Sequence, residues 1–87
     1  MGVELDVLRV LEKVPRQSPK MVKKYLKDVE KLDYSISQVK NALNYHAGSG
    51  HATRVARGIY EITELGKYVL HHQVNVQDSG ESELMSQ

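Results

Sequence analysis

The stretch SISQVKNALNYHAGSGHATRVARGIYEIT, residues 35–63, contains the pattern that decides the fold. It begins with Ser35 followed by Gln38, which is the spacing of a helix capping box. Apolar residues then recur at helical spacing until Gly48-Ser49-Gly50, where glycine is expected to end the helix. We therefore predict a helix over about residues 35–47.

The second half of the stretch predicts a β-hairpin. Two short segments, 51–55 and 59–62, are rich in β-branched and aromatic residues, which is typical of strands. Ala56-Arg57-Gly58 lies between them and is expected to form the turn.

Helical patterns flank this stretch on both sides. Residues 3–14 carry apolar side chains at helical spacing, and Pro15 ends the pattern. Ser18-Pro19 suits the start of a second helix, because serine caps and proline fits the first helical position. The predicted apolar stripe of this helix consists of Val22, Tyr25, Leu26 and Val29. A fourth helix is expected from Thr63 to about residues 71–73.

The 87 residues suffice for one domain, which we place at residues 1–74. The chain has no cysteine, so disulfides and thiolate chemistry are excluded. No signal peptide or membrane-spanning run is recognisable, and we expect a cytoplasmic protein without a membrane partner. Residues 75–87 carry three acidic residues and no basic one, and they predict a disordered acidic tail.

Positive charge is concentrated in the middle of the chain. Residues 1–74 carry a net charge of +4, and residues 16–58 alone carry nine basic against three acidic residues. A localised basic region is the electrostatic footprint of a nucleic-acid binder. A solvated lysine-rich helix face is the alternative interpretation of the same charges.

The predicted order of elements is three helices, a two-stranded hairpin and a fourth helix, an α+β fold that is mostly α. Over residues 5–70 the sequence resembles the winged helix-turn-helix domains of archaeal and bacterial transcription regulators. The resemblance is carried by Ile36, Val39, Ala42 and Leu43 of the third helix, by Gly48, and by the run RGIYEITELG at residues 57–66. It implies a three-helix core, a hairpin that serves as the wing, and a C-terminal helix. It also implies that the third helix enters the major groove of double-stranded DNA and that the wing contacts the neighbouring minor groove or backbone.

A helical wheel divides the third helix into two faces. Val39, Leu43 and His46 define the buried face, and the opposite face carries amides and hydroxyls but no acid. Such groups suit the major groove, where Asn or Gln can bind adenine through two hydrogen bonds. The candidate DNA-binding residues of this helix are Ser37, Gln38, Lys40, Asn41, Asn44 and Tyr45.

These candidates differ in their expected roles. Asn41 points straight out and is expected to read a base, whereas Lys40, Asn44 and Tyr45 suit phosphate contacts. Two alternatives remain open, because Gln38 could serve only in the capping box and Tyr45 could pack against the second helix.

Basic residues on two other elements complete the predicted interface. Arg54 and Arg57 flank the hairpin turn, where arginine suits the negative potential of a narrow minor groove. A plain surface hairpin is the alternative. Lys20 and Lys23 lie near the start of the second helix and are expected to reach phosphates.

Other functional classes find little support in the sequence. The histidines show no spacing that forces metal ligation, so we expect no metal and no small-molecule cofactor. No phosphate loop or nucleophile elbow is present, so we expect no enzyme. We further expect a homodimer that uses leftover apolar residues of the first and last helices, Leu5, Leu8, Val69 and Leu70. The main alternative to DNA binding is a winged-helix module that docks proteins within a larger assembly.

Overall fold

The computed structural model describes residues 2–72. Its elements are α1 (Val3–Lys13), α2 (Pro19–Asp28), α3 (Ile36–Ser49), β1 (Ala52–Ala56), β2 (Ile59–Ile62) and a C-terminal helix at residues 64–72. The predicted acidic tail, residues 75–87, lies outside the described residues, as does the predicted domain boundary at residue 74. None of the helices within residues 2–72 is long and apolar enough to cross a membrane.

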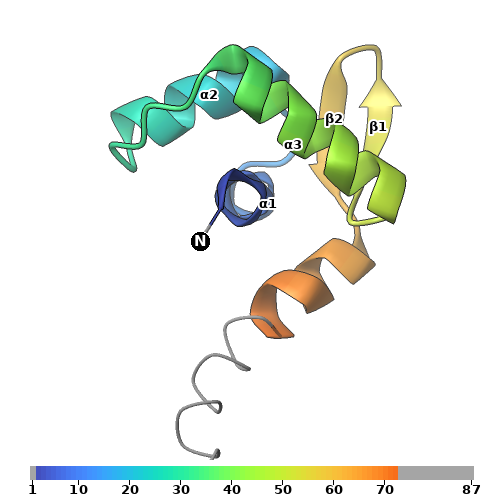
Figure 1. Ribbon diagram of the computed structural model, residues 1–87. Coiled ribbons are helices and arrows are strands. Elements are labelled where there is room, and N and C mark those ends of the chain that lie inside the picture. Colours follow the sequence, from blue (N-terminus) through green and yellow to red (C-terminus); the bar gives the residue numbers. More distant parts are fainter. Residues whose placement is uncertain (1, 73–87) are drawn as a thin grey trace, which may run out of the picture.

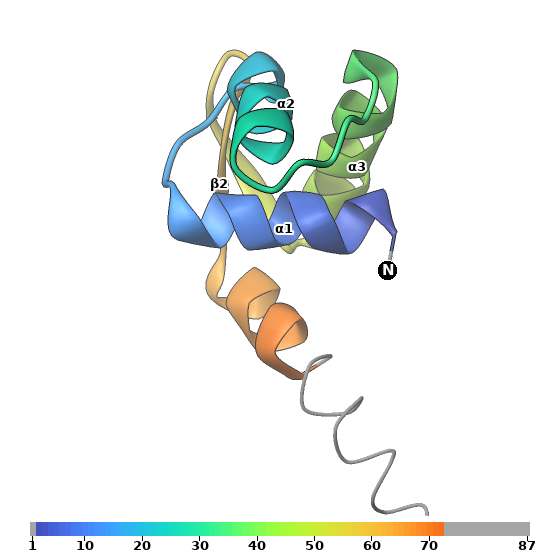
Figure 2. The same cartoon turned by 90° about the vertical axis from the view of Figure 1, so that its left-hand side faces the viewer.

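The helix α1 lies at the centre of the arrangement (Figure 1). The helices α2 and α3 and the hairpin lie on one side of it, and the C-terminal helix lies on the other side (Figure 2). Strands β1 and β2 are antiparallel, with Ala52 opposite Ile62 and Arg54 opposite Tyr60. The hairpin packs beside α3, and its tip points away from the C-terminal helix.

Serine caps start α2 and α3 as the sequence predicts. The Ser18 hydroxyl accepts a hydrogen bond from the Met21 amide at 3.2 Å, and Pro19 occupies the first helical position. At α3 the capping box is complete. The Ser35 hydroxyl accepts from the Gln38 amide at 3.1 Å, and the Gln38 side-chain oxygen accepts from the Ser35 amide at 2.9 Å.

Two predicted boundaries are wrong by one or two residues. The helix α3 continues through Gly48 to Ser49 rather than stopping near residue 47, because Gly50 is the residue that adopts the left-handed conformation (φ 84°) and ends it. The strand β1 consequently begins at Ala52, and it extends to Ala56, which still pairs with Ile59. The hairpin turn is therefore Arg57-Gly58, with Gly58 at φ 70°.

The core forms where α1, α2, α3 and the hairpin meet. Its fully buried side chains include Val7, Leu11, Val22, Leu26 and Leu43. Val29, which was expected in the apolar stripe of α2, is 58% exposed. The helix α2 ends at Asp28, and Val29 is its C-cap residue.

A buried charged cluster fixes the segment between α2 and α3 against α1. Asp6 is only 6% exposed, and it accepts hydrogen bonds from the Tyr34 hydroxyl at 2.5 Å and from Arg9 at 3.0 Å. Arg9 also pairs with Glu30, and that hydrogen bond raises the pKa of the guanidinium. The bond to Asp6 raises the pKa of Tyr34. Since Tyr34 immediately precedes the cap of α3, this cluster sets where α3 begins.

The C-terminal helix is attached at the end of α3. The Thr63 hydroxyl donates to the Gly50 carbonyl oxygen at 2.6 Å and accepts from the Gly66 amide at 3.0 Å, so Thr63 caps this helix as predicted. The Thr63 amide donates to the His51 carbonyl oxygen at 3.0 Å. A Cβ atom on Gly66 would lie 2.0 Å from that same oxygen. The early glycine is therefore required by close packing of the helix against the backbone of residue 51.

The residues expected to form a homodimer are partly used within the chain itself. Leu8 of α1 and Leu70 of the C-terminal helix are buried in the single chain, which removes them from any surface. The exposed apolar side chains of the C-terminal helix are instead Leu65 and Tyr68, at 49% and 58% exposure.

Replacing Gly66 by alanine is expected to lower the free energy of unfolding by about 1–3 kcal/mol, because the new methyl group has to displace backbone. Gly48→Ala is the matched control, since a Cβ atom there meets nothing within 4 Å. In the interior of α3 the control should stabilise by about 0.5–1 kcal/mol. Urea denaturation of both variants measures the two effects, and a neutral Gly66→Ala would contradict the packing described.

Candidate nucleic-acid interface

The helix α3 exposes the face that the sequence predicts. Val39, Leu43 and His46 are buried. The predicted DNA-binding residues of the helix are all exposed: Ser37, Gln38, Lys40, Asn41, Asn44 and Tyr45. The exposed face thus presents amides, hydroxyls and one ammonium group without a carboxylate, and amides of this kind can bind base edges in the major groove.

Two of these side chains are engaged within the protein. The Gln38 oxygen accepts a hydrogen bond from the Ser35 amide in the capping box, and its amino group remains free to contact a ligand. The Tyr45 ring lies edge-on to His46 and His51, with centroids 5.2 and 6.0 Å away. Tyr45 therefore packs against the end of its own helix and the start of the hairpin, and it remains 54% exposed.

Tyr60, which is not among the predicted site residues, connects the hairpin to the exposed face of α3. Arg54 lies opposite Tyr60 in the hairpin, and its guanidinium carbon lies 5.4 Å from the centre of the Tyr60 ring. Arg54 also donates to the Tyr60 hydroxyl at 3.3 Å, and that hydroxyl donates to the Asn44 side-chain oxygen at 3.4 Å. Hydrogen bonds through Arg54, Tyr60 and Asn44 thereby join the predicted wing to the predicted base-reading helix.

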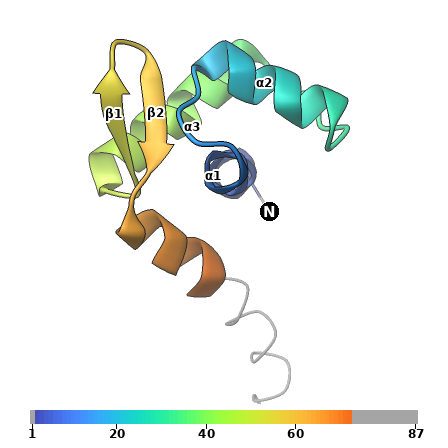
Figure 3. The same ribbon diagram turned by 180° about the vertical axis from the view of Figure 1, so that it is seen from behind.

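The backbone of Tyr60 is held equally firmly. Its amide and carbonyl exchange two hydrogen bonds of 2.9 Å with Gln17, in the segment between α1 and α2 that runs beside β2 (Figure 3). On the outer side of the hairpin, Arg16 pairs with Glu61 at 3.3 Å. The hairpin is consequently fastened to the helical core along β2, while β1 and Arg54 face α3.

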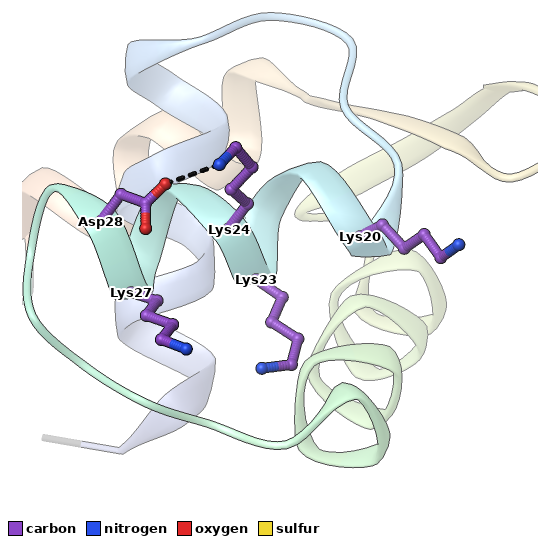
Figure 4. Close-up of a pocket in the computed structure, with 5 residues that line it drawn as sticks. All are labelled: Lys20, Lys23, Lys24, Lys27 and Asp28. Carbon is purple, nitrogen blue, oxygen red and sulfur yellow. Dashed lines mark hydrogen bonds and ion pairs between the residues drawn. The ribbon is translucent and has the colours of Figure 1, made fainter.

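The lysines of α2 divide into paired and unpaired groups (Figure 4). Lys24 binds Asp28 at 2.8 Å, which lowers the pKa of Asp28, and Lys23 lies 3.7 Å from Asp33. Lys20, at the start of α2, points away from the other lysines toward the end of the molecule that carries the hairpin. The structure thus leaves Lys20 available, whereas the charge of Lys23 is partly compensated.

The predicted contact elements share one side of the molecule. The start of α2, the first turns of α3 and the tip of the hairpin all lie on the side opposite the C-terminal helix (Figures 1 and 2). Within residues 2–72, four basic residues of this side form no ion pair: Lys20, Lys40, Arg54 and Arg57. Their charge is available to a polyanion.

This arrangement can be compared with known structures. Over 84% of its length the chain superimposes on 46% of a PadR-like transcriptional regulator from Bacillus cereus, with a TM-score of 0.70 and 20% sequence identity. The protein has the winged helix-turn-helix fold. The winged helix thus spans less than half of that regulator's chain. The sequence matches no protein-family model and none of the curated proteins with which it was compared.

In the winged-helix fold, α3 occupies the position called the recognition helix, and the β1–β2 hairpin occupies the position called the wing. The fold class predicted from the resemblance is therefore confirmed. The structure places every candidate residue on the recognition helix, on the wing or near the start of α2. Among the described residues, no group of three or more His, Cys, Asp or Glu side chains is placed to hold a metal ion.

A histidine pair lies at the junction of the recognition helix and the wing. His46 is buried, and its Nε2–H donates to the Glu4 carbonyl oxygen at 2.6 Å. Its Nδ1 is then an acceptor, and it receives the Nδ1–H of His51 at 3.0 Å. Burial lowers the pKa of His46, the charge of His51 acts in the same direction, and the bond to Glu4 opposes both.

Acidification is therefore expected to destabilise the protein through His46. Because the pKa of His46 is lower in the folded state than in the unfolded chain, the unfolded chain binds more protons. The free energy of unfolding should therefore decrease as the pH falls from about 6.5, the ordinary histidine value, to the folded-state pKa of His46. Besides His51, the groups that face His46 are Tyr45 and Glu4, and the carboxylate of Glu4 favours the charged form. Urea denaturation at pH 7.5 and at pH 5 measures the decrease in the free energy of unfolding.

The control for this prediction is His46→Gln, whose amide NH₂ can replace Nε2–H toward the Glu4 carbonyl but does not titrate. Its stability should depend less on pH over this interval than that of the parent. Equal pH dependence of the parent and His46→Gln would contradict the assignment.

Proposed function

We propose that the protein is a DNA-binding transcriptional regulator whose recognition helix enters the major groove and whose wing contacts the neighbouring minor groove or backbone. The observation that carries the proposal is that Tyr60 joins Arg54 of the hairpin to Asn44 on the acid-free exposed face of α3. The likeness to a regulator of transcription supports the same role.

Each candidate residue has a place in this proposal. Asn41 and Ser37 face outward from the recognition helix and would meet base edges. Lys40 and Lys20 would neutralise phosphates on either side of the groove, and Arg57 at the wing tip would reach the backbone or minor groove. Lys23 would contribute less, because Asp33 already lies 3.7 Å away. We further propose that the protein is cytoplasmic and that it binds DNA without catalysis and without a cofactor.

A second role is favoured by one observation. The C-terminal helix exposes Leu65 and Tyr68 on the side of the molecule away from the proposed DNA surface. Such a helix could dock a protein partner, including a second copy of this chain, while the recognition helix remains free. Sedimentation that shows only monomer at high concentration would remove the homodimer from this proposal.

Removing the two wing arginines should weaken binding to duplex DNA and make it less dependent on salt. Each phosphate contact contributes about 0.9 to the slope of log K against log salt concentration, so Arg54→Ala with Arg57→Ala should reduce the slope by about 1.8. Fluorescence anisotropy on a random duplex across a salt series measures it.

The matched control is Lys13→Ala with Lys67→Ala, which removes the same charge from the end of α1 and from the C-terminal helix. If the control changes the slope as much as the wing variant does, the wing has no special part in binding. If the parent binds no duplex even at low salt, the proposed function is wrong.

A further inference from the structure

We propose that Arg54 and Asn44 bind one and the same DNA phosphate, between the recognition helix and the wing, and that Tyr60 positions both side chains for it. This inference rests on the proposed function and deepens it, because it names the ligand of these side chains. It also separates the roles of the two wing arginines. Arg54 binds the backbone, whereas Arg57 is the one that can reach the minor groove.

The shape of a duplex explains why a phosphate should lie between these two elements. A sugar-phosphate strand separates the major groove from the neighbouring minor groove. A protein that inserts α3 in the major groove and lays the β1–β2 hairpin over the neighbouring groove must therefore straddle that strand. Arg54, Tyr60 and Asn44 join the hairpin to the helix. They lie where the strand would pass.

The guanidinium of Arg54 lies beside α3 and not at the tip of the wing. Arg54 is opposite Tyr60 in the hairpin, whereas the turn is formed by Arg57 and Gly58. The guanidinium carbon is 5.4 Å from the centre of the Tyr60 ring, and Nη2 donates to the Tyr60 hydroxyl at 3.3 Å. An arginine has further N–H donors, and Arg54 forms no ion pair within residues 2–72. Its charge and its remaining donors can therefore bind a phosphate.

Asn44 approaches the same point from the helix. Its side-chain oxygen accepts from the Tyr60 hydroxyl at 3.4 Å. Its NH₂ group donates no hydrogen bond within residues 2–72. The Arg54 nitrogen and the Asn44 oxygen each lie within 3.4 Å of the same Tyr60 oxygen, so one phosphate group can accept hydrogen bonds from both side chains.

Tyr60 is suited to position these two side chains because the fold fixes it. It is only 6% exposed, its ring belongs to the hydrophobic core, and its backbone makes two hydrogen bonds to Gln17. Side chains with many rotamers lose conformational freedom when they bind a ligand, and ordering them beforehand reduces that cost. The Tyr60 hydroxyl orders Arg54 and Asn44 in this way, and Tyr60 is therefore a positioning residue.

The test is a double-mutant cycle on the affinity for a random duplex, measured by fluorescence anisotropy across a salt series. Arg54→Ala should reduce the slope of log K against log salt concentration by about 0.9, the contribution of one phosphate. Asn44→Ala should weaken binding about threefold or more without changing the slope, because it removes a hydrogen bond but no charge. In the Arg54→Ala background, Asn44→Ala should weaken binding less than about 1.5-fold, because the two side chains share one ligand.

Arg57→Ala is the matched control, because it removes the same charge from the tip of the same hairpin. Its effect on affinity should multiply with that of Asn44→Ala, as expected for separate contacts. Tyr60→Phe keeps the buried ring and removes the hydroxyl. It should weaken binding and reduce the coupling between Arg54 and Asn44, while the salt slope stays because the charge of Arg54 remains. Tyr25→Phe, which removes a tyrosine hydroxyl from α2, should bind like the parent.

The outcomes separate the two proposals. If the parent binds duplex but the effects of Arg54→Ala and Asn44→Ala multiply, the two side chains do not share a phosphate. The inference is then overturned and the DNA-binding function stands, and an unchanged salt slope in Arg54→Ala overturns the inference as well. If Tyr60→Phe, shown to be folded by thermal unfolding, keeps the affinity and the coupling of the parent, the positioning role of Tyr60 is wrong. If the parent binds no duplex even at low salt, both proposals fail together.

Discussion

The placement of the wing against the helices depends on Tyr60. Its ring fills part of the core, its backbone bonds the segment between α1 and α2, and its hydroxyl joins Arg54 to Asn44. A hairpin of two short strands is only marginally stable by itself. One residue that is bonded on three sides converts it into a rigid projection with a defined distance to the recognition helix.

The recognition helix is positioned by interactions at both of its ends. At its start, the buried cluster of Asp6, Arg9 and Tyr34 holds the preceding segment on α1, and the capping box fixes the first turn. At its end, His46 bonds the backbone of α1 and contacts His51 before the wing. Because both ends are fixed to α1, the exposed face of the helix has a single direction relative to the wing, as a surface that reads a groove requires.

Much of the fold could be predicted from local signals. The caps at Ser18 and Ser35 and the two faces of α3 follow from short-range rules, and the structure confirms them. The predicted end of α3 and the predicted start of β1 are each off by one or two residues. The reason is that the sequence Gly48-Ser49-Gly50 does not reveal which residue adopts the left-handed conformation that ends the helix. The burial of Asp6 and the importance of Tyr60 were missed because both depend on contacts between distant segments. Tyr60 could have been found only from the strand register that places it opposite Arg54.

The central claim is that the recognition helix and the wing together form the DNA surface. The most direct measurement is a nuclear magnetic resonance titration of the isotope-labelled protein with a short duplex, following every backbone amide. The account predicts that shift changes are concentrated in the first three turns of α3, around residues 54–60 and at the start of α2, while the C-terminal helix is unaffected. Shift changes confined to the C-terminal helix, or spread evenly over the molecule, would contradict it.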